Sequence, residues 1–319
     1  MSDFPKFVEF REEGPREGFQ IEKKIYPIEQ RVELLNMLSE TGLKRIQVGS
    51  FVSPQYVPQM ADTGELFERI ERKPGVKYTS LWLNEKGFRK ALSAHKVDLD
   101  PRLLFYPSEK FARANNNCSS AEIREKQRDW VRLYKQEGLR VDAAYVMTAF
   151  GCNLEGPIPQ ERILDDFRFV LQLCQEEDIP VPILVIADTM GWGNPEAVKR
   201  MIGALREMAP QARIGMHIHD TRGMGIANLY AALSMGVDMF ESSVAGLGGC
   251  PFAGHGHARA AGNVCTEDAV FLCRELGIET GIDLDKLIAA AQKAEEIIGA
   301  PLMGRVMHSG GLDKYRKAA

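Results

Sequence analysis

Short apolar and β-branched runs alternate along the chain with longer amphipathic stretches. In the stretch 28–41, Ile28, Val32 and Leu35 recur at the spacing of one helix face, and Gly42 follows as a C-cap. The same pattern predicts further helices at 62–71, 86–95, 120–137, 160–176, 195–208, 225–235, 266–276 and 284–298. The apolar runs predict strands at 7–10, 45–51, 77–83, 102–106, 141–150, 181–188, 213–219 and 239–244.

A strand that is regularly followed by a helix is typical of an α/β protein with a parallel sheet. Eight such units over roughly 280 residues match a closed (β/α)8 TIM barrel better than an open, doubly wound sheet. No GxGxxG motif follows the first strand, which disfavours a dinucleotide-binding fold. We therefore expect a TIM-barrel catalytic domain over 1–300 and a C-terminal helical extension that ends in a tail, 301–319.

Composition narrows the function classes. The 319 residues include 40 Lys and Arg against 44 Asp and Glu, a net charge of −4, which disfavours a nucleic-acid partner. The first residues, MSDFPKFVEFREEGPREGF, contain no apolar leader segment, and no apolar run is long enough for a membrane span. The six cysteines form no CxxC pair, so they are expected to be free thiols. These features predict a cytoplasmic protein with no membrane association.

In a TIM barrel the chemistry lies on the loops at the carboxyl ends of the strands. The seventh expected strand ends in His217 and His219, which point to the same side because side chains alternate along a strand. Two imidazoles with this spacing form half of a site for a divalent metal. The alternative is a pair of hydrogen-bonded histidines without a metal.

Charged residues also follow the first and sixth expected strands. Arg16 and Glu17 come just after the first, where a carboxylate offers a metal ligand and a guanidinium stabilises negative oxygen. The alternative is a solvated charged turn. Asp188 ends the sixth strand and would either orient a metal ligand or cap the next helix.

A glycine-rich loop follows the eighth expected strand. It carries Cys250, which would be an exposed proton donor or nucleophile. It continues through His255 and His257, a second HxH pair that we expect to contact ligand or solvent rather than to form a rigid metal site. Gly262 and Asn263 end the loop.

Together these motifs resemble those of the 3-hydroxy-3-methylglutaryl-CoA lyase family, metal-dependent TIM-barrel lyases related to synthases. The resemblance extends through nearly the whole chain. It rests on GPREG at 14–18, SFVSP at 50–54, VPQM at 57–60, NNNCS at 115–119, HIHDT at 217–221, SSVAGLGGCP at 242–251, GN at 262–263 and TED at 266–268.

The resemblance implies roles for the matching residues. The metal, Mg²⁺ or Mn²⁺, would be bound by Glu17, His217, His219 and Asn263. Arg16 would stabilise an enolate, Cys250 would be the catalytic loop cysteine, and Asp188 would lie near the metal. An acyl-CoA thioester is the implied substrate, and its binding positions would include Gln20, Gln47, Ser50, Asn115, His255 and His257.

Three departures from the family pattern fall in or near the acyl pocket. Family lyases have Asp where this chain has Glu17, whose carboxylate reaches further by about one carbon–carbon bond, ~1.5 Å. Gln47 replaces a family glutamate and so removes a negative charge. The loop between Cys250 and Asn263 is longer by about four residues than in the lyases, and it contains the second HxH pair. These departures bear on the substrate more than on the reaction type.

The resemblance implies a retro-Claisen cleavage of a 3-hydroxyacyl-CoA, with 3-hydroxy-3-methylglutaryl-CoA as the first candidate, giving acetyl-CoA and acetoacetate. Alternatives are citramalyl-CoA, which would give pyruvate and acetyl-CoA, or thioesters with a longer branch. Further alternatives are a Claisen condensation as in isopropylmalate synthase, a metal-dependent hydroxy-oxo-acid aldolase, and a non-catalytic barrel that binds acyl-CoA. By analogy with the family, a homodimer or higher homo-oligomer is expected.

Overall fold

The computed structural model describes residues 4–253 and 262–316. Its eight strands form one sheet in the order β3-β2-β1-β8-β7-β6-β5-β4. The pairings of β1 with β2, β2 with β3, β4 with β5, β5 with β6 and β6 with β7 are parallel. The strands are β1 (Glu9–Glu12), β2 (Arg45–Ser50), β3 (Lys77–Leu81), β4 (Arg102–Phe105), β5 (Ala143–Val146), β6 (Ile183–Asp188), β7 (Ile214–Ile218) and β8 (Met239–Ser242).

Helices follow the strands in the order that a (β/α)8 barrel requires, which confirms the predicted fold class. They are α1 (Gly14–Ile21), α2 (Ile28–Ser39), α3 (Thr63–Arg69), α4 (Glu85–Ser93), α5 (Glu109–Asn116), α6 (Ser120–Gln136), α7 (Gln160–Glu176), α8 (Pro195–Met208), α9 (Gly225–Ser234) and α10 (Thr266–Glu275). The C-terminal extension consists of α11 (Leu284–Ile298), α12 (Val306–Ser309) and α13 (Asp313–Arg316). The division into a barrel over 1–300 and a tail over 301–319 stays a prediction.

All eight expected strands and all nine expected helices occur, with shifts at their ends. The expected strand 141–150 is the clearest difference, because β5 stops at Val146. Two residues later Thr148 has a φ of 50°, a left-handed conformation that no strand residue adopts. Helices α1 and α5, which the pattern did not predict, both begin just after a strand and carry residues of the candidate site.

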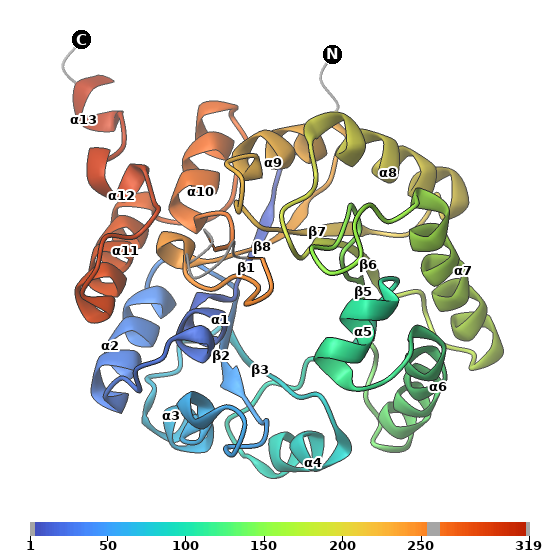
Figure 1. Ribbon diagram of the computed structural model, residues 1–319. Helices are drawn as coiled ribbons and strands as arrows, with labels where there is room; N and C mark the ends of the chain where they lie inside the picture. Colours follow the sequence, from blue (N-terminus) through green and yellow to red (C-terminus); the bar gives the residue numbers. More distant parts are fainter. Residues whose placement is uncertain (1–3, 254–261, 317–319) are drawn as a thin grey trace. The chain divides into compact units, whose positions relative to one another are not determined.

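The described chain divides into two compact units. The first comprises 4–5, 100–240 and 250–253. Figure 1 shows α6, α7 and α8 on the outer side of its strands. Its core includes the buried side chains of Ala143, Tyr145, Val185 and Met239. This unit contains the histidine pair and Cys250.

The second unit comprises 6–99, 241–249 and 262–316. In it α11 lies beside α2, where Lys293 forms an ion pair with Glu33 at 3.1 Å. Leu287, Ala290 and Ala294 form part of the buried face of α11. This unit contains α1, β2 and Asn263. Among the described residues, no helix has the length and apolar character needed to cross a membrane.

Candidate active site

Helix α1 places three candidate residues on one short element. Pro15 lies in its first turn, and the carboxylate of Glu12 accepts from the Gly14 amide at 2.8 Å, although no conventional side-chain cap is present. Arg16 and Gln20 are one helical turn apart and share a face. The segment that could have been a solvated charged turn is therefore an ordered helix, and Arg16 and Glu17 are each only 12% exposed.

Glu12 connects α1 to two later segments of the same unit. Besides the Gly14 amide, it accepts from the Val244 amide at 2.8 Å and from the Thr266 hydroxyl at 2.6 Å. Complete burial raises its pKa to about 7, although these hydrogen bonds oppose the shift. One buried carboxyl thus holds the starts of α1 and α10 and the segment after β8.

Arg16 lies among three acceptors. Its Nη2 donates to Glu13 at 2.8 Å and to Glu17 at 2.9 Å, and its Nε donates to the side-chain oxygen of Gln47. A guanidinium only donates, so the Gln47 oxygen must face Arg16, and the amide nitrogen of Gln47 is buried without a partner. The positive charge of Arg16 is thus held in a fixed position.

Two other predicted binding residues meet nearby. The Ser50 hydroxyl, at the end of β2, donates to the side-chain oxygen of Gln20 at 3.0 Å. Ser50 is fully buried and Gln20 partly exposed. Arg16 with Gln47 and Ser50 with Gln20 thus form two hydrogen-bonded pairs within one unit, and their roles with a substrate stay predictions.

Asn263 is oriented by the acceptors around its amide nitrogen. That nitrogen lies 2.6 Å from Glu17 Oε2, 2.8 Å from the Ser243 hydroxyl and 3.2 Å from the Leu247 carbonyl. The amide oxygen of Asn263 is buried and has no partner. A buried carbonyl oxygen that accepts no hydrogen bond is a suitable ligand for a hard metal cation.

The histidine pair lies at the end of β7. His217 and His219 are 8% and 4% exposed, and their Nε2 atoms are 2.9 Å apart. The pair therefore has the same-side geometry that the sequence predicts. Two facing imidazole nitrogens at this distance suit a shared cation or a shared proton.

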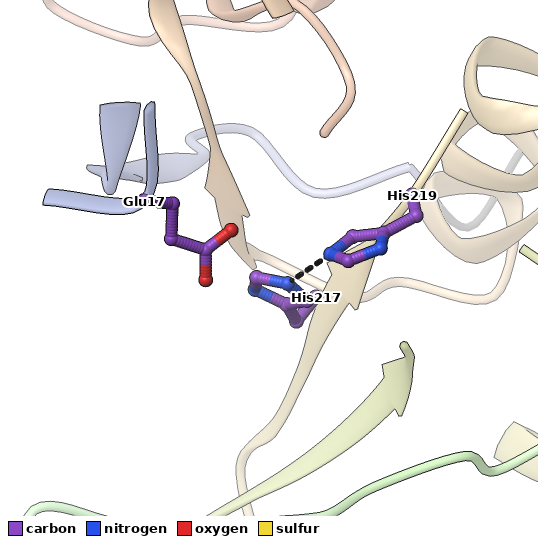
Figure 2. Close-up of side chains that lie close together, drawn as sticks. All are labelled: Glu17, His217 and His219. Carbon is purple, nitrogen blue, oxygen red and sulfur yellow. Dashed lines mark hydrogen bonds between the residues drawn. The ribbon is translucent and has the colours of Figure 1, made fainter. Parts of the chain in front are cut away.

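Figure 2 shows Glu17 together with the two histidines. A carboxylate oxygen of Glu17 and one ring nitrogen each of His217 and His219 lie within 4.8 Å of one another. With the Asn263 oxygen as the expected fourth ligand, the donor set would be one carboxylate, two imidazoles and one amide. Carboxylate and amide oxygens suit Mg²⁺ and Mn²⁺, whereas imidazoles add affinity for softer ions, so the set fits a divalent cation.

Asp188 does not cap the next helix, and its expected role beside a metal ligand stays a prediction. Its two carboxylate oxygens accept from the amides of Trp192 and Gly193, at 2.8 and 3.0 Å, whereas Asn194 is the N-cap of α8. Burial raises its pKa to about 6, and the charge of His217 is among the weaker opposing causes. Asp188 thus orders the loop after β6 and lies near the histidine pair.

Cys250 begins a turn that lies near Tyr106. Burial raises the pKa of Tyr106, and a smaller contribution to the same rise comes from Cys250. Asn115, on α5, donates to the Tyr106 hydroxyl at 3.5 Å. Cys174 and Cys273 instead lie buried in α7 and α10, where burial raises their thiol pKa to about 11 and about 12. Cys250 is partly exposed, as is Cys118, and its role as a proton donor stays a prediction.

Two predicted residues fall outside the part of the chain that the structure describes, and one buried carboxyl has no role predicted from the sequence. His255 and His257 lie outside the described residues. The sequence reasoning assigned no role to Glu267, which is fully buried and accepts from the Ala245 amide at 3.0 Å. Burial raises its pKa to about 8. Its neighbourhood, Thr266 to Asp268, was part of the resemblance, which was the one available signal.

Comparisons with known proteins identify the family of this chain. A family model described as HMGL-like matches residues 8–293. The mitochondrial hydroxymethylglutaryl-CoA lyase of Bos taurus is 39% identical over 291 residues, 91% of this chain and 85% of that protein. A Pseudomonas aeruginosa protein, 3-hydroxy-3-isohexenylglutaryl-CoA/hydroxy-methylglutaryl-CoA lyase, is 37% identical over 298 residues, 93% of this chain and 95% of that protein.

Solved structures are similar over almost the full length. A hydroxymethylglutaryl-CoA lyase from Pseudomonas aeruginosa has a TM-score of 0.86 at 36% identity, covering 96% of this chain and 98% of that one. An HMG-CoA lyase from Acinetobacter baumannii, in complex with coenzyme A and 3-methylmalate, has a TM-score of 0.85 at 33% identity. That match covers 98% of each chain.

Proposed function

Because this chain belongs to the HMGL-like family, we propose that it is a metal-dependent carbon–carbon lyase that cleaves 3-hydroxy-3-methylglutaryl-CoA to acetyl-CoA and acetoacetate. The observation that carries the proposal is the convergence of Glu17, His217 and His219, with ligand atoms within 4.8 Å of one another. The oxygen of Asn263, which is buried without a partner, would be the fourth ligand.

Glu17, His217, His219 and Asn263 would hold Mg²⁺ or Mn²⁺. When bound, such an ion acts as a Lewis acid and lowers the pKa of a hydroxyl group near it. The histidine pair favours Mn²⁺ over Mg²⁺, because imidazole is a poor ligand for the harder ion.

The remaining chemistry belongs to side chains of this chain. His217 is the candidate base that takes the proton of the 3-hydroxyl group, with Asp188 as its helper. The C2–C3 bond then breaks, its electron pair passes to the thioester, and acetoacetate is released. The fragment that remains is the enolate of acetyl-CoA.

The enolate is the high-energy species, so its oxygen requires a fixed cation. Arg16 fulfils this role, since Glu13, Glu17 and Gln47 hold its guanidinium in place. The Cys250 thiol donates its proton to the enolate carbon, which completes acetyl-CoA. The thiolate regains a proton from the base or from solvent.

The named relatives favour 3-hydroxy-3-methylglutaryl-CoA over citramalyl-CoA as the substrate. One relative is also named for a 3-hydroxy-3-isohexenylglutaryl-CoA, which has a longer branch at the same carbon. We therefore keep a longer-branched 3-hydroxyglutaryl-CoA as the second candidate. Binding of the thioester is assigned to Gln20, Gln47, Ser50 and Asn115.

The test is a screen of purified protein with these thioesters, with release of acetyl-CoA as the readout. We expect turnover of 3-hydroxy-3-methylglutaryl-CoA that EDTA abolishes and Mn²⁺ or Mg²⁺ restores. Cys250→Ala and His217→Ala should each lower kcat by about 10²-fold or more, the range for loss of an acid–base group. Near-normal turnover in both variants would refute the assignment.

A homo-oligomer and the cytoplasmic compartment remain proposals. The relatives include lyases named as mitochondrial and as cytoplasmic, so they support neither compartment over the other.

A further inference from the structure

Asn153 uses every hydrogen-bonding position of its side chain. Its amide nitrogen donates to the carbonyls of Phe252 and Ala253, at 3.0 and 3.2 Å. Its oxygen accepts from Trp192 Nε1 at 2.7 Å and from Arg222 Nη2 at 3.3 Å. An amide offers two donors and two acceptor positions, so this side chain has no unused capacity.

The orientation of this amide is fixed by chemistry. The indole and the guanidinium can only donate, and the two carbonyls can only accept. A flipped amide would set donor against donor and acceptor against acceptor. The Asn153 side chain therefore links two donors, Trp192 and Arg222, to two acceptors, the carbonyls of residues 252 and 253.

The two carbonyls belong to the turn that begins at Cys250. This turn is closed by a hydrogen bond from the Ala253 amide to the Cys250 carbonyl at 3.0 Å. The Phe252 ring packs edge-on against Phe111 of α5, with centroids 5.8 Å apart. Because the turn is closed on itself, the contacts of residues 252 and 253 also position Cys250.

The two donors are themselves anchored. Arg222 donates to the carbonyls of Met190 and Gly191, at 2.7 and 3.0 Å, and lies over the Trp192 ring at 5.7 Å. The Trp192 amide is bound to Asp188 at 2.8 Å. A continuous series of contacts thus leads from Asp188, at the end of β6, to the turn that contains Cys250.

Gly151 makes this arrangement sterically feasible. A Cβ at this position would lie 2.4 Å from atoms of the Trp192 ring, which a real contact does not allow. The indole can therefore lie against the backbone two residues before Asn153 and reach its oxygen.

We propose that Asn153 is a positioning residue that fastens the turn Cys250–Ala253 to Trp192 and Arg222, and thereby sets where the Cys250 thiol meets the enolate. This inference rests on the role of Cys250 in the proposed function. We call the set of Asn153, Trp192, Arg222 and the turn the latch.

Two substitutions and one matched control test the latch. Asn153→Asp is nearly isosteric, keeps the acceptor side, and places an oxygen against the carbonyls of residues 252 and 253. Asn153→Ala removes all four hydrogen bonds. The control is Asn194→Asp, the same change at the N-cap of α8, where Asp caps equally well and does not contact the turn.

The first readout is alkylation of Cys250 by iodoacetamide, followed by peptide mapping. The alkylation rate is measured as a function of pH. Its plateau at high pH gives the rate constant of the thiolate, which reports the accessibility of Cys250 independently of its thiol pKa. We expect this constant to rise about tenfold in both Asn153 variants, because roughly 1.4 kcal/mol of turn stabilisation corresponds to that factor. It should not change in Asn194→Asp, and thermal unfolding should report folded protein in all three.

The second readout is turnover of 3-hydroxy-3-methylglutaryl-CoA. The Asn153 variants should lose about tenfold in kcat with KM unchanged within about twofold, because the latch affects protonation rather than binding. Alkylation and kcat equal to those of Asn194→Asp would overturn the proposal, and so would faster alkylation with unchanged kcat. Absence of turnover in the wild type would refute the proposed function instead, while alkylation would still decide whether the latch exists.

Discussion

The amide nitrogen of Asn263 donates to Glu17 Oε2 at 2.6 Å, and this contact decides which atom of Asn263 remains for a ligand. Because the amide nitrogen is hydrogen-bonded, the buried atom of Asn263 that has no partner is the amide oxygen. Two candidate metal ligands from distant parts of the sequence therefore orient each other. The same bond makes the length of the side chain at position 17 critical.

Glu17→Asp shortens the carboxylate by one methylene group, ~1.5 Å. The contact with Asn263 then breaks, and the carboxylate withdraws from the two histidines. We expect Mn²⁺ affinity to fall by about tenfold or more, measured by calorimetric titration of metal-free protein. Glu13→Gln is the control, because Glu13 contacts Arg16 but is not a metal ligand in this account. Unchanged affinity in Glu17→Asp would show that Glu17 does not bind the ion directly.

Arg16→Lys retains a positive charge but loses the planar guanidinium that contacts Glu13, Glu17 and Gln47 together. An ammonium group cannot reproduce this geometry and will not be held at a developing oxyanion. We expect kcat to fall by about 10²-fold, with a much smaller change in KM, in steady-state assays of acetyl-CoA release. If Arg16→Lys keeps wild-type kcat, charge alone is sufficient and the fixed geometry has no role.

Glu267 should make the stability of the folded protein depend on pH. Burial raises its pKa from 4.5 to about 8, so the folded state binds a proton more tightly than the unfolded state. Its contribution to stability is complete below pH 4.5 and is lost as pH rises through about 8. Glu267→Gln replaces this carboxyl group with an amide, which does not ionise in this pH range.

When melting temperature is plotted against pH, the lines for the variant and the wild type should cross. At pH 5 the variant should melt at or below the wild type, and at pH 9 above it, by roughly 2–4 °C for each kcal/mol of ionisation cost removed. Both proteins are measured in a chelator, so that metal binding does not add its own pH dependence. A difference between the two melting temperatures that does not vary with pH would contradict the raised pKa of Glu267.

The fold could be predicted because apolar residues recur along the chain with the regular spacing of strands and helices. The alternation of apolar runs and amphipathic stretches identified every strand, and the short motifs at the strand ends identified His217 and His219. Helix α1 was missed because its first turn, with Gly14, Pro15, Arg16 and Glu17, has no apolar period. Its start depends on the carboxylate of Glu12, a tertiary contact to two other segments.

The latch could not have been predicted from local pattern. Asn153 contacts Trp192, Arg222 and Phe252, which lie 39, 69 and 99 positions away in the sequence. Nothing in the residue types marks these four as partners. The buried carboxyls of Glu12 and Glu267 are similar cases, because burial and not spacing shifts their pKa values.

The central claim is that one divalent ion is held by side chains from β7, α1 and the segment before α10. Its most direct test is pulsed electron paramagnetic resonance of Mn²⁺ bound to the protein, which detects nitrogen nuclei coupled to the ion. We predict coupling to two imidazole nitrogens, reduced to one in His217→Ala and in His219→Ala, and no coupled signal in the double variant. Mn²⁺ that binds with no imidazole coupling, or with coupling that survives both substitutions, would contradict the account.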